Sequence, residues 1–261
     1  MSHARDGAQR IRIGCSGWNY DHWRHGVFYP ERLPASRWLR FYAEWFDTVE
    51  LNNTFYRLPR TTAAERWAAE TPNDFVFAVK VSRYITHVKR LRDAGEHLPL
   101  LLERIEPLRA KLGPLLWQLP PTFRRDDDRL AEALDAFPRE LRHAIEFRHE
   151  SWFVPDVLAL LRERNVALVV AGRVTEPTAD FAYVRFHHGE RGRRGNYSDA
   201  ELDEWAEWIA AWSDRRDVYA YFNNDWEGFA PRNALGLKER LGLESQRGAR
   251  DHARRSHAHR P

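Results

Sequence analysis

The chain has 261 residues, 43% of them hydrophobic with 11 tryptophans, which suits a large packed core and excludes an intrinsically disordered composition. Its single cysteine, Cys15, excludes an internal disulfide and a CxxC-type zinc or redox motif, and a reducing compartment fits best. The formal net charge is +3. The chain has neither an apolar N-terminal leader nor a run of roughly 20 apolar residues, so we expect a cytoplasmic protein with no membrane partner.

Eight short runs of strand-forming residues recur after residues 1–10, which we expect to be a flexible N-terminus. Most of the runs are apolar on both faces, the pattern typical of parallel strands covered by helices. They are IRIGC (11–15), TVELN (48–52), FVFAVKV (75–81), PLLWQL (114–119), HAIEF (143–147), VALVVA (166–171), FAYVRFH (181–187) and VYAYF (218–222).

Helical patterns lie between most of these runs. The stretch 198–214 begins at a candidate N-cap, Ser198, and the stretch 98–113 contains Pro107, which should kink or interrupt a helix. Two further helices are expected at 138–142 and 154–165. The stretch GRVTEPTAD (172–180) is too short and too rich in turn residues for a normal helix, so one crossover should be irregular.

This alternation predicts an α/β fold, a single-domain TIM-type (β/α)8 barrel over residues 11–243. An open doubly wound sheet is the alternative, but neither G-x-G-x-x-G nor G-x-x-x-x-G-K-[ST] follows any run. The segment 244–261 has five arginines against two acids and almost no apolar residues, which predicts a disordered basic tail. This tail alone carries a charge of +3, so residues 1–243 are formally neutral. It is either a solvated extension or a nonspecific anion-binding arm.

Polar or aromatic groups follow seven of the eight runs. In a barrel of this type the active site lies at the C-terminal ends of the strands. Side chains alternate along a strand, so Glu50 shares a side with Asn52, and Glu146 shares a side with Arg148. We therefore expect acids and bases to meet at one mouth of the barrel.

Several of these motifs together resemble a known family. In chain order they are GCSGWNYDHW, FYP, TVELNNTFY, KVSRYITH, QLPPTF, EFRHESW and FNN. They resemble the DUF72 family, also called YecE-like proteins, over about residues 11–241. The resemblance implies a TIM-type barrel.

Glu50 and Glu146 are the candidate catalytic pair, since two carboxylates in different environments can act as general acid and base. The alternative is that each is a buried ion-pair partner of Lys80, Arg148 or Arg185. Those three cations, together with Arg83, could equally clamp a carboxylate or a phosphate.

The remaining candidates would bind or orient substrate. The histidines could titrate near neutral pH or join the glutamates as metal ligands, although no H-E-x-x-H spacing supports a divalent metal. The aromatic residues could stack on a sugar or a base, or simply pack. The predicted substrate-binding set is Trp18, Tyr20, Asn52, Tyr56, Lys80, Arg83, His87, Gln118, Arg148, Arg185, His187 and Asn223.

We therefore expect an enzyme, hydrolase- or isomerase-like, that acts on a small or extended anionic substrate containing phosphate or sugar by acid/base chemistry at the barrel mouth. Two alternatives stay open. One is a metal-dependent sugar isomerase or endonuclease with the glutamates and His187 as ligands. The other is a noncatalytic nucleic-acid-binding protein that uses the basic tail and aromatic loops. Cofactor and oligomeric state are open as well.

Overall fold

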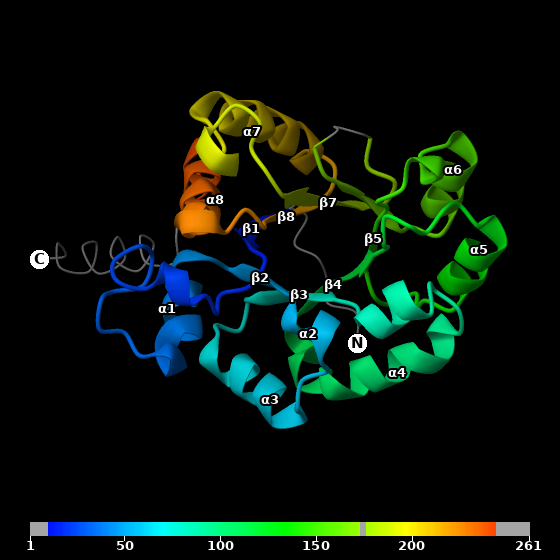
Figure 1. Cartoon of the computed structure of the whole chain (residues 1–261), viewed down its shortest axis with the longest axis horizontal. Coiled ribbons are helices and arrows are strands. Elements are labelled where there is room, and N and C mark those ends of the chain that lie inside the picture. Colours follow the sequence, from blue (N-terminus) through cyan, green and yellow to red (C-terminus); the bar gives the residue numbers. More distant parts are fainter. Residues whose placement is uncertain (1–9, 173–175, 244–261) are drawn as a thin grey trace, which may run out of the picture.

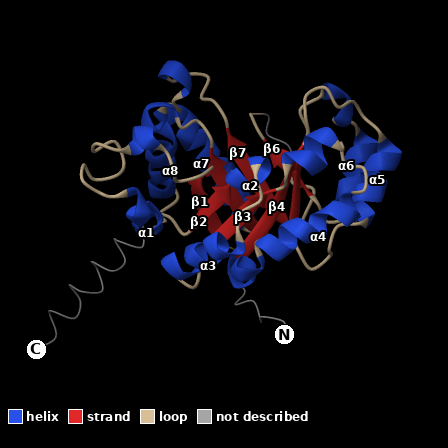
Figure 2. Ribbon diagram, turned by 60° about the horizontal axis from the view of Figure 1, so that its bottom comes forward, coloured by secondary structure: helices blue, strands red, loops and turns tan. Residues whose placement is uncertain are grey.

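Eight parallel strands form the centre of the computed structural model, which describes residues 10–172 and 176–243. Helices surround the strands on the outside (Figures 1 and 2). The strands are β1 Ile11–Cys15, β2 Thr48–Leu51, β3 Val76–Lys80, β4 Leu112–Gln118, β5 His143–Glu146, β6 Ala167–Val170, β7 Phe181–Phe186 and β8 Asp217–Phe222. The chain is thus a single-domain barrel of the TIM type, as its alternating pattern predicts.

The barrel is nearly closed. Hydrogen-bonded pairs run in the order β1-β8-β7-β6-β5-β4-β3-β2, and a single bridge between Ser16 and Glu50 joins the two ends of this sheet. Gly14 allows the close approach of β1 to β2, because a Cβ atom there would lie 2.3 Å from the carbonyl oxygen of Thr48.

Within the described part of the chain, six of the seven connections between consecutive strands contain helices, and two more helices follow β8. The longer helices are α1 Trp38–Trp45, α3 Thr61–Glu70, α4 Ala94–Arg104, α5 Asp127–Asp135, α6 Pro155–Glu163, α7 Asp199–Ser213 and α8 Phe229–Arg240. Shorter ones are η1 Asp21–Trp23, η2 Ala35–Arg37, α2 Asn53–Tyr56, the π-helical turn η3 Tyr84–Val88, η4 Glu106–Lys111, η5 Glu150–Trp152, η6 Arg193–Gly195 and η7 Trp226–Gly228.

Most helix predictions are confirmed. Ser198 caps α7 in a reciprocal capping box with Glu201, and α4 ends at Arg104, just before Pro107. The β6–β7 connection has no helix among its described residues, although residues 173–175 of the predicted irregular crossover lie outside them.

The helix predicted at residues 138–142 is wrong. These residues form only a turn, in which Leu141 N donates to Pro138 O at 3.1 Å. The helix before β5 is α5, which starts earlier because Asp126 caps it by accepting a hydrogen bond from Arg129 N.

The apolar core has two parts. The larger one fills the space between the strands and the surrounding helices. The smaller one fills the barrel interior, where alternate strand residues point to the axis. Its buried members are Ala78, Leu116, Ala144, Ala167, Val169, Phe181, Tyr183, Tyr219 and Tyr221.

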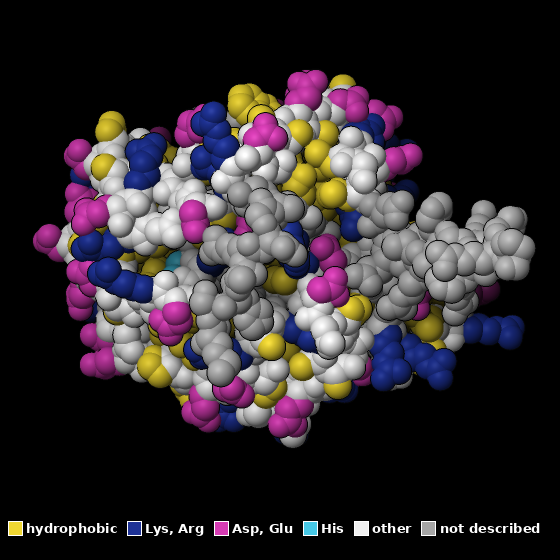
Figure 3. All heavy atoms as spheres, turned by 180° about the vertical axis from the view of Figure 1, so that it is seen from behind, with side chains coloured by type: hydrophobic (Ala, Val, Ile, Leu, Met, Phe, Trp, Pro, Cys, Tyr) yellow, Lys and Arg dark blue, Asp and Glu magenta, His cyan; other side chains and the backbone are white. Residues whose placement is uncertain are grey.

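On the surface, the face shown in Figure 3 carries basic and acidic side chains interspersed with each other. This mixture agrees with the formal neutrality of residues 1–243. Within the described residues, no helix has the length and apolar character needed to cross a membrane. The predicted tail 244–261, and residues 1–9 of the predicted N-terminal segment, lie outside the described residues.

Candidate functional site

The C-terminal mouth of the barrel carries a polar layer directly above the apolar interior. This layer arises from the alternation of side chains, because each of its residues comes two positions after an interior residue. Lys80, Gln118, Glu146, Arg185 and Asn223 follow Ala78, Leu116, Ala144, Tyr183 and Tyr221 in this way.

Arg185 on β7 lies at the centre of this layer and joins the two predicted catalytic acids. Its Nη2 lies 2.8 Å from Glu50 Oε1, and its Nη1 lies 2.6 Å from Glu146 Oε2. Nη1 also donates to Gln118 Oε1 at 3.1 Å. Arg185 is only 1% exposed and Glu50 is fully buried, so this is a desolvated ion-pair network. Removing one member of such a network leaves an uncompensated buried charge.

Glu50 has two further partners that complete its hydrogen bonding. Ser16 Oγ donates to Oε1 at 2.7 Å, and Tyr183 Oη donates to Oε2 at 2.8 Å. Burial and the charge of Glu50 hold the pKa of Tyr183 well above its ordinary value, so its hydroxyl stays protonated as a donor. Both oxygens of Glu50 are therefore held in fixed positions.

Glu146 contacts Arg148 and His187 through its other oxygen. Arg148 Nη2 lies 2.5 Å and His187 Nε2 lies 3.1 Å from Oε1. Burial by itself raises the pKa of Glu146, but Arg185, His187 and Arg148 outweigh it and hold that pKa well below its ordinary value. Glu146 is thus an anion at neutral pH.

His187 is held between Glu146 and Asn223. The Asn223 amide nitrogen lies 3.1 Å from His187 Nδ1, and His187 Nε2 lies 3.1 Å from both Glu146 Oε1 and Arg148 Nη2. The ring is therefore oriented by residues from β5 and from the end of β8.

Lys80 differs from Arg148 and Arg185, which are both paired with glutamates. Within the described residues, no carboxylate lies within 4 Å of its Nζ, which sits 4.2 Å from the centroid of the Phe55 ring. Burial, and next the charge of Arg185, lower the pKa of Lys80 to about 8. Its backbone is fixed, since Thr54 Oγ1 donates to its carbonyl at 2.6 Å.

His87 and Arg83 come from the segment after β3. His87 Nδ1 hydrogen-bonds Thr86 Oγ1 at 3.0 Å, and its ring packs edge-to-face on Phe55. Burial, followed by the charges of Lys80, Arg83 and Arg148, lowers the pKa of His87 to about 4, so the ring is neutral at physiological pH. Among the described candidate residues of the mouth, four cations (Lys80, Arg83, Arg148 and Arg185) stand against the carboxylates of Glu50 and Glu146, a net charge of +2.

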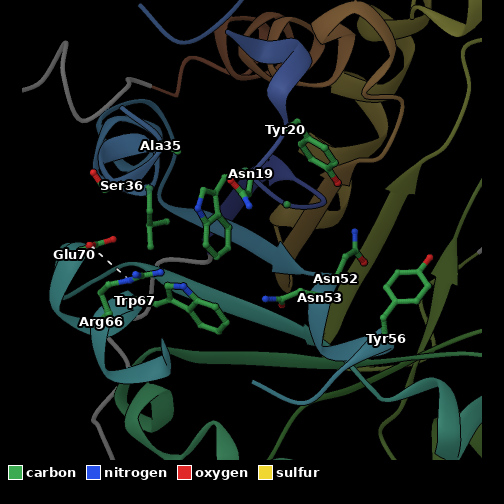
Figure 4. Close-up of a pocket in the computed structure, with 13 residues that line it drawn as sticks. Asn19, Tyr20, Ala35, Ser36, Asn52, Asn53, Tyr56, Arg66, Trp67 and Glu70 are labelled. Carbon is green, nitrogen blue, oxygen red and sulfur yellow. Dashed lines mark ion pairs between the residues drawn. The ribbon is translucent and has the colours of Figure 1, made fainter. Parts of the chain in front are cut away.

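The other predicted residues line a separate space, which we call the side cavity. Trp18, Tyr20, Asn52 and Tyr56 border this cavity of about 410 Å³ beside the mouth. Figure 4 shows Asn53 between Trp67 and Tyr56 in this cavity, with Arg66 and Glu70 from α3 nearby. The structure thus divides the predicted substrate-binding set into a charged mouth and an uncharged aromatic and amide surface.

Gly17 shapes the entrance of the side cavity. Its φ of +97° suits glycine, and a Cβ atom there would lie 2.8 Å from Tyr20 Oη. That hydroxyl donates to Ser16 O at 2.6 Å and accepts from the Asn52 amide. The turn after β1 therefore links the side cavity to Ser16 and, through Ser16, to Glu50.

A metal centre has no obvious ligand set here. In the residues the structure describes, no group of three or more His, Cys, Asp or Glu side chains is arranged to hold a metal ion. Glu50 and Glu146 instead bind the two ends of the Arg185 guanidinium.

Sequence reasoning missed Ser16 and Tyr183 as partners of Glu50, and Trp67 as a wall of the side cavity. Tyr183 could have been found from its position two residues before Arg185. Cys15, beside Ser16, is fully buried, and burial raises the pKa of its thiol well above the ordinary value, which makes it an unreactive group.

Comparison with known proteins gives a consistent result. The profile of the family described as "Protein of unknown function DUF72" matches residues 12–257. YecE of Escherichia coli K12 is 34% identical over 145 residues, which cover 55% of this chain and 50% of YecE, so the match spans about half of that relative's length. YunF of Bacillus subtilis 168 is 26% identical over 90% of this chain and 95% of its own.

Solved structures agree. A DUF72 family protein from Thermotoga maritima MSB8 has a TM-score of 0.78 and 32% identity, covering 90% of this chain and 100% of its own. One from Enterococcus faecalis V583 shares the fold, with a TM-score of 0.74 at 24% identity over 90% of this chain and 96% of its own. The profile match and the Thermotoga structure both extend over nearly the whole barrel, and this chain therefore belongs to the DUF72 family.

Proposed function

We propose that this protein is an enzyme that binds an anionic substrate, carrying a phosphate or carboxylate on a small or sugar-containing molecule, at the C-terminal mouth of the barrel and converts it by acid/base chemistry. The observation that carries the proposal is Lys80, a buried amine that has no carboxylate partner among the described residues and lies in a mouth of net positive charge. Structural ion pairs by themselves give no reason for an unpaired cation there.

The positive charge favours an anion. Arg148 lies at the exposed edge of the network and Arg83 is exposed beside His87, so both can present guanidinium groups to a ligand. A guanidinium matches a phosphate or carboxylate through two parallel hydrogen bonds. In this proposal these two arginines hold the anion while Arg185 stays paired to the glutamates.

Lys80 is assigned the proton transfer. Its pKa of about 8 lies close to neutrality, where an amine can accept a proton at moderate driving force. Glu146 is too strongly stabilised as an anion to donate a proton at neutral pH, and Glu50 has both oxygens engaged. The two glutamates, which sequence analysis favoured as the acid/base pair, therefore orient His187, Arg148 and Arg185 in this proposal.

The test is a turnover assay on a defined mixture of sugar phosphates and sugar acids, analysed by mass spectrometry before and after incubation. Lys80→Met should abolish any conversion that the wild type performs. Lys238→Met is the matched control, because Lys238 is another buried lysine with a lowered pKa but lies on α8 near Phe46. Equal activity of the two variants, or no conversion of any compound by the wild type, would contradict the proposal.

The two alternative functions have less support in the structure. The metal-dependent reading needs ligands beyond the Glu146 and His187 pair, and the nucleic-acid reading depends on the tail, which lies outside the described residues. The cytoplasmic location stays a prediction from the single cysteine and from the lack of an apolar leader or membrane-length run in the sequence.

A further inference from the structure

Helix α2 separates the side cavity from the charged mouth. Asn53 and Tyr56, three residues apart, border the side cavity, whereas Phe55 between them contacts the ammonium of Lys80 at 4.2 Å. A molecule that occupies both spaces would therefore cross a wall only one helical turn long. The two spaces are therefore adjacent, with different chemistry on the two sides of α2.

The side cavity is rich in groups that suit hydroxyls. Three asparagines (Asn19, Asn52 and Asn53) border it, and each amide offers both a donor and an acceptor. Asn19 and Asn53 are exposed, and their side-chain amides have no hydrogen-bond partner among the described residues. Asn52 Oδ1 is buried without a partner within the described protein, while the Asn52 amide nitrogen is used by Tyr20. A buried acceptor without a partner favours a ligand that brings a donor.

The two tryptophan rings of the side cavity do not form a slot for a flat ring. Trp18 and Trp67 meet edge-to-face, with planes at 85° and centroids 5.6 Å apart. Two parallel faces would be needed to sandwich a nucleobase, and this pair offers none. A perpendicular pair instead gives one apolar platform beside polar groups, including the Arg66–Glu70 ion pair drawn in Figure 4.

We propose that the side cavity is a sugar subsite, which holds the neutral glycosyl part of the same substrate whose anionic group binds at the mouth, and this assignment rests on the proposed function. A sugar ring places C–H groups on an aromatic platform and directs hydroxyls, each both donor and acceptor, toward the amides. The volume of about 410 Å³ lies within the range of small-molecule pockets and leaves room for a monosaccharide.

Saturation-transfer NMR with neutral methyl glycosides tests this subsite without the anion. The probes are methyl glucoside, methyl galactoside and methyl ribofuranoside, and adenosine and uridine represent flat bases. At least one methyl glycoside should bind the wild type. Asn53→Ala should weaken that binding roughly fivefold, the effect of one lost hydrogen bond, and Trp18→Leu should abolish it.

Asn73→Ala is the matched control, because Asn73 is an exposed asparagine that precedes β3 at the opposite end of the barrel. It should leave glycoside binding unchanged. Asn53 is exposed, so the result does not depend on the fold surviving the loss of Trp18. Inorganic phosphate binding, measured in parallel with wild type and Lys80→Met, reports on the mouth alone.

The outcomes separate the two proposals. Phosphate binding without binding of any glycoside overturns the sugar subsite and leaves the proposed function standing. Nucleoside binding that is lost in Asn53→Ala, with no glycoside binding, also overturns it in favour of a base subsite. Glycoside binding lost in Asn53→Ala supports the sugar subsite, and if phosphate then fails to bind, the anionic part of the substrate and the proposed function are wrong.

Discussion

Replacing Arg185 by methionine should be strongly destabilising. The substitution removes the guanidinium that contacts Glu50 at 2.8 Å and Glu146 at 2.6 Å, and it leaves Glu50, which is fully buried, with only neutral partners. Breaking one side of a buried ion pair costs about 3 to 5 kcal/mol. With roughly 2 to 4 °C for each kcal/mol in a chain of this size, the melting temperature should fall by about 6 to 20 °C.

The loss of stability caused by Arg185→Met should depend on pH. In the wild type, the lowered pKa of Glu146 contributes stability above its ordinary value of 4.5, and this contribution is lost as the pH falls toward the lowered value. In Arg185→Met, acid instead relieves the uncompensated charge of the buried carboxylate that has lost its cation, whereas Glu146 keeps its pair with Arg148. The difference between wild type and variant should therefore narrow between about pH 7 and pH 4.

Urea unfolding at both pH values, followed by far-UV circular dichroism, measures this difference. Adding Glu50→Gln to Arg185→Met should recover part of the loss, because it removes the buried charge left without a cation. Arg191→Met, which removes an exposed pair with Glu204, is the control and should unfold near the wild-type midpoint. The reasoning would be refuted if Arg185→Met unfolded at the wild-type urea midpoint, or if its loss of stability were as large at pH 4 as at pH 7.

Three further changes test other parts of the structure. Ser198→Ala should destabilise the protein by about 1 kcal/mol in thermal unfolding because it removes the capping box of α7, whereas Ser213→Ala at the other end of that helix should have little effect. Gly17→Ala should lower the free energy of unfolding in urea more than Gly26→Ala does. Both glycines have positive φ, but only at Gly17 would the added Cβ meet a neighbour, Tyr20 Oη at 2.8 Å. Equal losses of stability would show that the contact with Tyr20 is unimportant. Truncation after Leu243 should leave the urea midpoint unchanged, because the removed segment has almost no apolar residues, and a large fall in the midpoint would show that the tail packs on the barrel.

The charged mouth was accessible to sequence reasoning because it depends on local rules. Strand alternation and the position of polar residues at strand ends brought Glu50, Glu146 and Arg185 to one place, and the ion pairs weighed as the alternative role for the glutamates are present. The same rules do not predict which hydrogen-bond and ion-pair partners each charged side chain has. Tyr183 and Ser16 complete the hydrogen bonding of the Glu50 carboxylate because the barrel closes between β1 and β2.

The side cavity was harder to predict from the sequence. Trp67, Arg66 and Glu70 lie on α3, and only the packing of this helix beside the turn after β1 brings them to Trp18. Helix α5 was missed because its acid-rich first turn hides an apolar stripe of just three buried residues, Leu130, Ala133 and Leu134. Its cap at Asp126 was the better local signal than the apolar pattern.

The most direct measurement of the central claim is a pH titration of the lysine amines by NMR after reductive ¹³C-methylation. The chain has only four lysines, so Lys80 can be assigned from the signal missing in Lys80→Arg. Its pKa should lie at about 8 in the free protein and should rise when inorganic phosphate is added, because a bound anion favours the charged amine. A titration of Lys80 near the ordinary value of 10.5, with no response to phosphate, would contradict the account of this mouth as an anion site with a proton-transferring lysine.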